Sequence, residues 1–69
     1  MAESSKNNTA KTVKRLRGKA GLSQEKLARL ADVSNNTVIN IERGENRNPT
    51  MATLKKIAKA LSVSVDKLL

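Results

Sequence analysis

The sequence predicts an all-α domain of five short helices, and three observations lead to this fold class. Apolar residues recur at spacings of three and four along the chain, and no segment of useful length alternates as a strand would. Ser or Thr precedes most of these apolar segments, where a helix N-cap is expected. With 69 residues, no Cys and no His, the chain fits one compact domain that depends on close helix packing or dimerisation.

The composition excludes several classes of function. Without His or Cys, the commonest general base, the best neutral-pH nucleophile and the usual zinc ligands are missing. The six acidic residues are scattered, so we expect no enzyme, no metal, no cofactor and no small-molecule site. No apolar run approaches the length of a membrane span and no signal peptide follows Met1, so we expect a cytoplasmic protein.

The charge balance indicates an anionic partner. Fourteen Lys and Arg against six Asp and Glu give a net charge of +8, which favours binding to nucleic acid or to an anionic membrane. Single-stranded nucleic acid is usually bound by stacking on aromatic rings, and this chain has none. A membrane-surface helix would need one long amphipathic segment with interfacial aromatics. Double-stranded nucleic acid is therefore the favoured partner.

The chain divides into a polar tail, 1–8, and a helical domain, 9–69. We expect the tail to be flexible; the alternative is a basic arm that follows a DNA groove. The first helix begins at Thr9 and ends before Gly21. Its spacing places five residues on one face: Ala10, Val13, Leu16, Arg17 and Ala20.

A short pattern that occurs three times marks where helices begin. Each copy has an apolar residue, a Ser and, four residues after the Ser, a second apolar residue: Leu22-Ser23…Leu27, Val33-Ser34…Val38 and Val63-Ser64…Leu68. This is the spacing of a Ser N-cap flanked by a hydrophobic staple. We therefore expect helices to begin near Gln24, Asn35 and Val65, while Thr50 caps a further helix that begins at Met51.

These starts define four further helices, at about 24–31, 35–43, 51–61 and 65–69. Gly44 suits the position that follows the second of them. The spacing predicts that the following residues face the core: Leu27, Leu30, Ala31, Val38, Ile41, Met51, Leu54, Ile57, Ala58 and Leu61.

Only Asp32, Val33 and Ser34 separate the second and third helices, which is typical of a helix-turn-helix. Ala28 is small enough for the two helices to cross closely. The outward face of the third helix then carries Asn35, Asn36, Ile39, Asn40 and Arg43. Asn is a poor helix former, but its amide can bond the N6 and N7 edge of adenine, and Ile39 could contact a thymine methyl. This pattern favours base readout; the alternative is a polar, solvated face.

The predicted helices and turn contain a long motif: Gly21-Leu22-Ser23-Gln24-x-x-Leu27-Ala28…Val33-Ser34…Val38-Ile39…Ile41-Glu42-Arg43-Gly44…Asn48-Pro49…Leu54…Ala58…Leu61-x-Val63. This motif resembles the phage Cro/repressor-type (XRE) helix-turn-helix family. The resemblance covers roughly residues 13 to 69. It implies a five-helix, lambda-repressor-like DNA-binding domain whose third helix enters the major groove. It also implies a dimer on a near-palindromic site.

The resemblance also implies DNA-binding residues by position: Gln24, Ser34, Asn35, Asn36, Thr37, Ile39, Asn40, Arg43, Arg47, Asn48 and Thr50. Phosphate contacts are expected from Gln24, Ser34, Arg43, Arg47 and the helix start at Thr50, since free N–H groups at helix starts suit phosphate. Asp32 departs from the family, which commonly has Gly there in a left-handed conformation. Asp tolerates that conformation better than most residues.

Arg17 and Glu42 both lie on the inward stripes of their helices, where an unpaired charge would be costly. We predict a partly buried, structural ion pair that joins the first and third helices, and the resemblance supports it. The alternative is that Arg17 contacts a phosphate.

The function favoured by these observations is a sequence-specific, double-stranded DNA-binding regulator of transcription, with repression as the expected mode. The alternative is an antitoxin or bridging adaptor that acts through protein contacts and needs no DNA-facing Asn cluster. Four apolar residues crowd the C-terminus, Val63, Val65, Leu68 and Leu69. They could pack inward or against a second copy, and we expect a weak homodimer that tightens on DNA.

Overall fold

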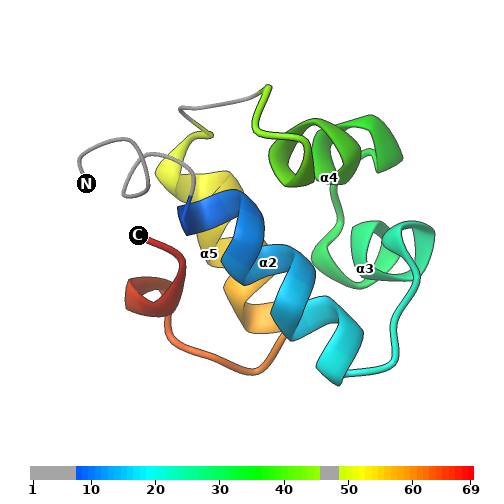
Figure 1. Cartoon of the computed structure of the whole chain (residues 1–69), viewed down its shortest axis with the longest axis horizontal. Helices are drawn as coiled ribbons and strands as arrows, with labels where there is room; N and C mark the ends of the chain where they lie inside the picture. Colours follow the sequence, from blue (N-terminus) through cyan, green and yellow to red (C-terminus); the bar gives the residue numbers. More distant parts are fainter. Residues whose placement is uncertain (1–7, 46–48) are drawn as a thin grey trace.

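The computed structural model describes residues 8–45 and 49–69, which form four α-helices and one short 3-10 turn. In chain order these are α2 (Asn8–Lys19), α3 (Gln24–Ala31), α4 (Asn35–Glu42), α5 (Met51–Ala60) and η1 (Val65–Leu68) (Figure 1). Neither described range contains a strand, so the all-α prediction is confirmed. The helix starts agree with the predictions to within one residue; α2 begins at Asn8, which was expected to end the tail.

The predicted short fifth helix is present only as a four-residue 3-10 helix, Val65–Leu68, so the count of five α-helices is not confirmed. The hydrogen bonds of this segment run from the N–H of Lys67 to Ser64 and from that of Leu69 to Asp66, three residues back in each case. A segment this short cannot complete successive α-helical bonds. Ser64 occupies the N-cap position but its side chain makes no capping bond, so that predicted cap is wrong.

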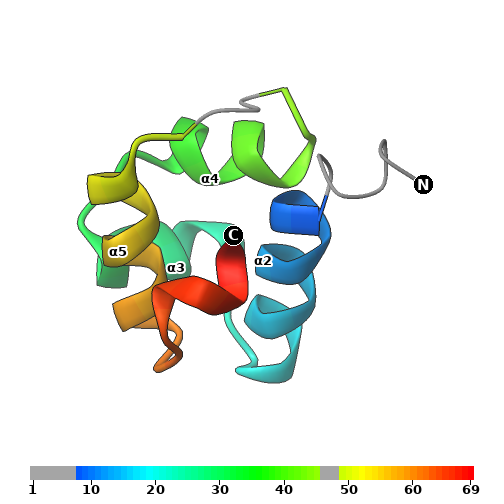
Figure 2. The ribbon, with the colours of Figure 1, turned by 90° about the vertical axis from the view of Figure 1, so that its left-hand side faces the viewer.

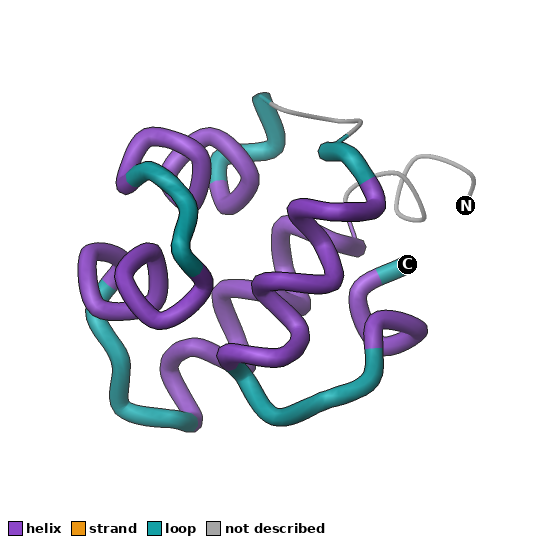
Figure 3. The backbone as a smooth tube through the Cα atoms, turned by 180° about the vertical axis from the view of Figure 1, so that it is seen from behind, coloured by secondary structure: helices purple, strands orange, loops and turns teal. Residues whose placement is uncertain are grey.

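The elements are arranged around one common core, as Figures 2 and 3 show from two sides. α3 packs against both α4 and α5, and α4 also packs against α2. η1 contacts α5 and α2, and the Thr9 hydroxyl near the start of α2 donates to the carbonyl oxygen of Leu68. The last turn of the described chain is therefore tied to its first helix.

The predicted core residues are mostly buried. The buried set is Val13, Leu27, Ala28, Ala31, Val38, Ile41, Leu54, Ile57, Ala58, Leu61 and Leu68. Among the four C-terminal apolar residues, Leu68 is fully buried, Val63 and Val65 pack partly against the core, and Leu69 is 62% exposed. Inward packing therefore accounts for three of these four residues and leaves only Leu69 for a second copy.

Three residues that the spacing placed inward are exposed. Leu30 is 55% exposed because α3 turns Ala28, rather than Leu30, toward the core beside Leu27. Met51 is 48% exposed because it occupies the first helical position of α5, while the buried residues begin one turn later at Leu54. Ala20 is exposed because α2 ends at Lys19.

None of the helices within the two described ranges is both long enough and apolar enough to cross a membrane.

Candidate nucleic-acid interface

The turn between α3 and α4 is built from backbone hydrogen bonds and one left-handed residue. Asp32 has φ 58° and ψ 46°, the conformation that Gly adopts most easily. The N–H of Val33 then donates to the Ala28 carbonyl at 3.0 Å, which closes the end of α3. Ala28 is buried, so the two helices approach closely, as expected for a helix-turn-helix.

The Ser and Thr caps confirm three of the predicted helix starts. The Ser23 side chain accepts from the N–H of Lys26, Ser34 from that of Thr37 and Thr50 from that of Thr53. Each such cap typically stabilises a helix by about 1 kcal/mol. Because α3 and α4 contain only eight residues each, these caps matter for keeping both helices in place.

The outward face of α4 carries uncharged amides. Asn35, Asn36 and Asn40 are exposed, whereas Val38 and Ile41 anchor the opposite face in the core. Ile39 and Thr37 are half-buried between the two faces. α4 contains no basic residue, so its exposed surface offers hydrogen-bonding groups rather than charge.

The predicted pair of Arg17 and Glu42 is present and partly buried. Arg17 Nε lies 2.6 Å from Glu42 Oε2, and its Nη2 donates to Glu42 Oε1 at 3.1 Å. The Glu42 side chain is only 3% exposed and that of Arg17 17%. Arg17 Nη1 also donates to the Leu22 carbonyl oxygen at 2.8 Å, so this guanidinium links α2 to both α4 and the turn before α3.

These contacts favour the structural role of Arg17 over a phosphate contact. Its hydrogen bond to Glu42 is the main cause that raises the pKa of Arg17; burial opposes the shift and the charge of Glu42 adds to it. Arg17 therefore stays charged across the pH range in which proteins fold. Three of its nitrogens are already occupied within the domain.

Gln24 belongs to the same network, which sequence reasoning did not predict. Its Nε2 donates to Glu42 Oε1 at 3.0 Å, and the residue is half-buried. An amide nitrogen carries two hydrogens, so one N–H remains for a phosphate oxygen. The Glu42 carboxylate thus accepts hydrogen bonds from α2 and α3 and holds both against α4.

Exposed hydroxyl pairs stand at the starts of α4 and α5. Ser34 Oγ and Thr37 Oγ1 are 2.7 Å apart, and Thr50 Oγ1 donates to Thr53 Oγ1 at 2.9 Å. Thr53 was not predicted to take part in this cap, although Thr50-x-x-Thr53 repeats the spacing of Ser34-x-x-Thr37. This spacing places a second hydroxyl one helical turn after the cap.

Arg43 follows the end of α4. Arg43 is exposed and its Nε lies 3.7 Å from Glu45 Oε2. Ion pairs this exposed contribute little, so the guanidinium is available to an external anion. Arg47 and Asn48 lie outside the described residues.

Comparison with known proteins places these features in a family. Residues 13–68 match the Helix-turn-helix family. The control protein C.SmaI of Serratia marcescens is 43% identical over 60 residues, which cover 87% of this chain and 70% of that protein. The uncharacterised HTH-type transcriptional regulator y4dJ of Sinorhizobium fredii is 44% identical over 50 residues, which cover 72% of this chain and 64% of the relative.

Solved structures share the arrangement of helices. The restriction-modification controller protein C.AhdI from Aeromonas hydrophila superposes with a TM-score of 0.86 at 32% identity, over 96% of this chain and 98% of that one. Hydroxypropylphosphonic acid epoxidase from S. wedmorenis matches with a TM-score of 0.79 at 29% identity, over 90% of this chain. That match covers 32% of the epoxidase chain, so the likeness concerns one part of that enzyme. The present chain belongs to the helix-turn-helix family.

Proposed function

We propose that this protein regulates transcription by inserting α4 into the major groove of double-stranded DNA. The observation that carries the proposal is the exposed amide face of Asn35, Asn36 and Asn40 on a short, capped helix. Each amide presents a donor and an acceptor, which match the N7 and N6 groups of adenine. Ile39, at the edge of this face, is placed to contact a thymine methyl group. Controller and regulator proteins among the relatives support a role of this kind.

Phosphate contacts come from groups that flank α4. Gln24 retains a free amide hydrogen, and Ser34 and Thr50 stand at helix starts, where unpaired N–H groups attract anions. Arg43 supplies a charge after the end of α4, and the sequence places Arg47 and Asn48 in the loop that follows. Since α4 has no basic residue, these flanking groups and the net charge of +8 provide the salt-dependent part of the affinity.

The active form is a weak homodimer on a near-palindromic site. Helix-turn-helix domains use two copies to read half-sites one helical turn apart. The exposed Leu69 supplies apolar surface for a small interface, which is too little for a strong one. We favour repression of transcription, by a protein that occupies a promoter, as the mode of regulation. The protein acts in the cytoplasm. Sedimentation at increasing protein concentration, with and without DNA, measures the dimer; a monomer on every selected site would contradict it.

Selection from a pool of random duplexes tests the proposed function directly. The account predicts an enriched motif with A·T pairs opposite α4 and two related half-sites. Binding of the selected duplex should weaken by several powers of ten between 50 and 200 mM salt, if a dimer neutralises about 6–10 phosphates. A pool without any enriched motif would argue for an adaptor that binds proteins instead.

A further inference from the structure

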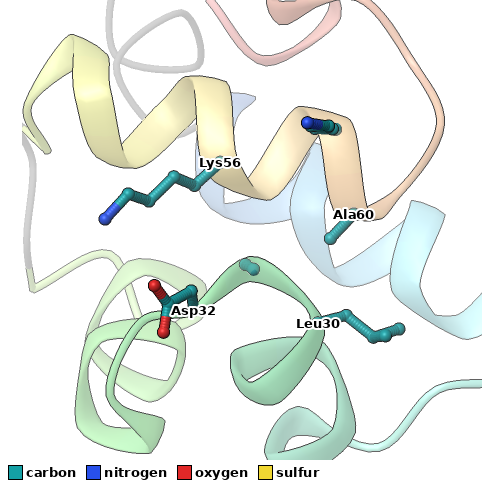
Figure 4. A pocket seen from close by; sticks show the side chains of 6 residues that line it. Leu30, Asp32, Lys56 and Ala60 are labelled. Atoms are coloured by element: carbon teal, nitrogen blue, oxygen red, sulfur yellow. The ribbon is translucent and has the colours of Figure 1, made fainter.

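An open hollow lies between the end of α3 and the second half of α5 (Figure 4). Its volume is about 510 Å³, and it is lined by Leu30, Ala31, Asp32, Lys56, Lys59 and Ala60. Leu30 is the large apolar residue of this surface and is 55% exposed. The alanines on the two helices are too small to cover it, so an apolar surface wide enough for a partner's side chain remains open.

The charges of the hollow are arranged unevenly. Figure 4 shows Asp32 and Lys56 at one end, while Leu30 and Ala60 lie at the other. Lys56 and Lys59 are both exposed, and neither forms an ion pair within residues 8–45 and 49–69. Two basic side chains thus stand beside an apolar floor, with one carboxylate in the same hollow.

We propose that this hollow, named here the α3–α5 hollow, binds an acidic segment of another protein. An apolar side chain of the partner packs on Leu30 and Ala60, and neighbouring carboxylates pair with Lys56 and Lys59. A nucleic-acid backbone would satisfy the lysines but has no apolar group to cover Leu30. A second copy of this chain is disfavoured as the occupant of the hollow because it has few carboxylates to pair with Lys56 and Lys59, with six acidic residues against fourteen basic ones.

The α3–α5 hollow goes beyond the proposed function and does not depend on it. None of its six lining residues belongs to the set predicted to contact DNA. The protein can therefore hold DNA through α4 and this partner through α3 and α5 at the same time. The L30N variant, which keeps the net charge, is expected to leave DNA affinity unchanged, and this separates the failure of this proposal from a failure of DNA binding.

Backbone amide spectra of the full chain, titrated with synthetic helical peptides, test the proposal. The probes carry one Leu flanked by Glu residues in several registers, and matched peptides replace each Glu by Gln. The Glu peptides are expected to shift the amide signals of Leu30, Ala31, Lys59 and Ala60. The double variant K56Q/K59Q should weaken that binding about fivefold, the scale of two exposed charge pairs. L30N should also weaken it, because it removes the apolar surface on which the Leu of the peptide packs. M51N removes an exposed apolar residue of α5 outside the hollow and is the matched control.

Three results would overturn the proposal. One is that no Glu peptide in any register shifts the signals of the hollow. Another is that Gln peptides bind as well as Glu peptides, since the lysines would then have no role. A third is that M51N weakens binding as much as L30N, since the contact would then be unspecific.

Discussion

α3 and α4 are matched in construction and differ in what they present to solvent. Both contain eight residues, and both begin with a Ser whose side chain accepts a backbone N–H. The outward face of α3 carries Glu25, Lys26 and Arg29, which are good helix formers, whereas that of α4 carries three exposed Asn residues. Asn lowers helix stability relative to those residues. The stability of α4 therefore does not explain its amides, which is why we propose that they serve in recognition.

The largest expected effect is on the free energy of unfolding, through the ion pair that holds α4 against α2. R17A leaves the carboxylate of Glu42 buried without its charge partner, which typically costs about 3–5 kcal/mol. In a 69-residue domain, this is a large share of the total free energy of unfolding, which is about 3–10 kcal/mol. Circular dichroism during urea or thermal unfolding measures the loss.

The matched control is R29A, which removes an Arg–Glu pair on the exposed face of α3. Arg29 Nη2 lies 3.6 Å from Glu25 Oε2, and both side chains are more than two-thirds exposed. The expected loss is about 0.5 kcal/mol or less. Equal losses in R17A and R29A would show that the Arg17–Glu42 contact does not brace α4.

The next largest effect separates recognition from stability. N40A is expected to lower affinity for the selected duplex by about 1–3 kcal/mol, the value of one bidentate base contact. The unfolding transition should stay nearly unchanged or rise slightly, because Asn40 is exposed and Ala is the better helix former. K26Q, on the outward face of α3, is the control and should retain base preference. Titrations by fluorescence anisotropy measure both, and equal losses would contradict the assignment of readout to α4.

The caps give a smaller, graded effect. S23A and S34A each remove a side-chain bond to a helix N–H and should each cost about 1 kcal/mol. S64A should change stability by much less, since Ser64 makes no capping bond. Chemical denaturation compares the three variants. Only S34A is expected to weaken DNA binding beyond its effect on folding, so similar DNA affinities for S23A and S34A would argue against a contact at the start of α4.

The smallest effect tests the turn between the two helices. Asp32 has φ 58°, and D32G is expected to raise stability by about 0.5 kcal/mol, because Gly relieves the left-handed strain but loses more chain entropy. S62G, where φ is 60°, should behave in the same way after α5. Thermal unfolding of both variants provides the measurement. A clear destabilisation by D32G would mean that the Asp32 side chain stabilises the turn.

The helices and their starts could be predicted because their causes are local. The Ser N-caps with their flanking apolar residues and the apolar period predicted where α3 and α4 lie in the sequence. The inward position of Arg17 and Glu42 on their helices predicted that the two side chains pair. The role of Gln24 could not be predicted, because a half-buried hydrogen bond between helices depends on how they pack. The exposure of Leu30 could not be predicted for the same reason. Periodicity identifies the apolar face of α3, but the packing of α5 against α3 decides which residues of that face are buried.

The most direct test of base readout is a double-mutant cycle between Asn40 and the adenines of the selected duplex. Replacing each adenine in turn by 7-deazaadenine removes the N7 acceptor and leaves base pairing intact. The account predicts one adenine at which the wild-type protein loses affinity by about 1 kcal/mol or more while the N40A variant loses almost none. Losses that are the same for both proteins at every adenine would contradict the insertion of the α4 amides into the major groove.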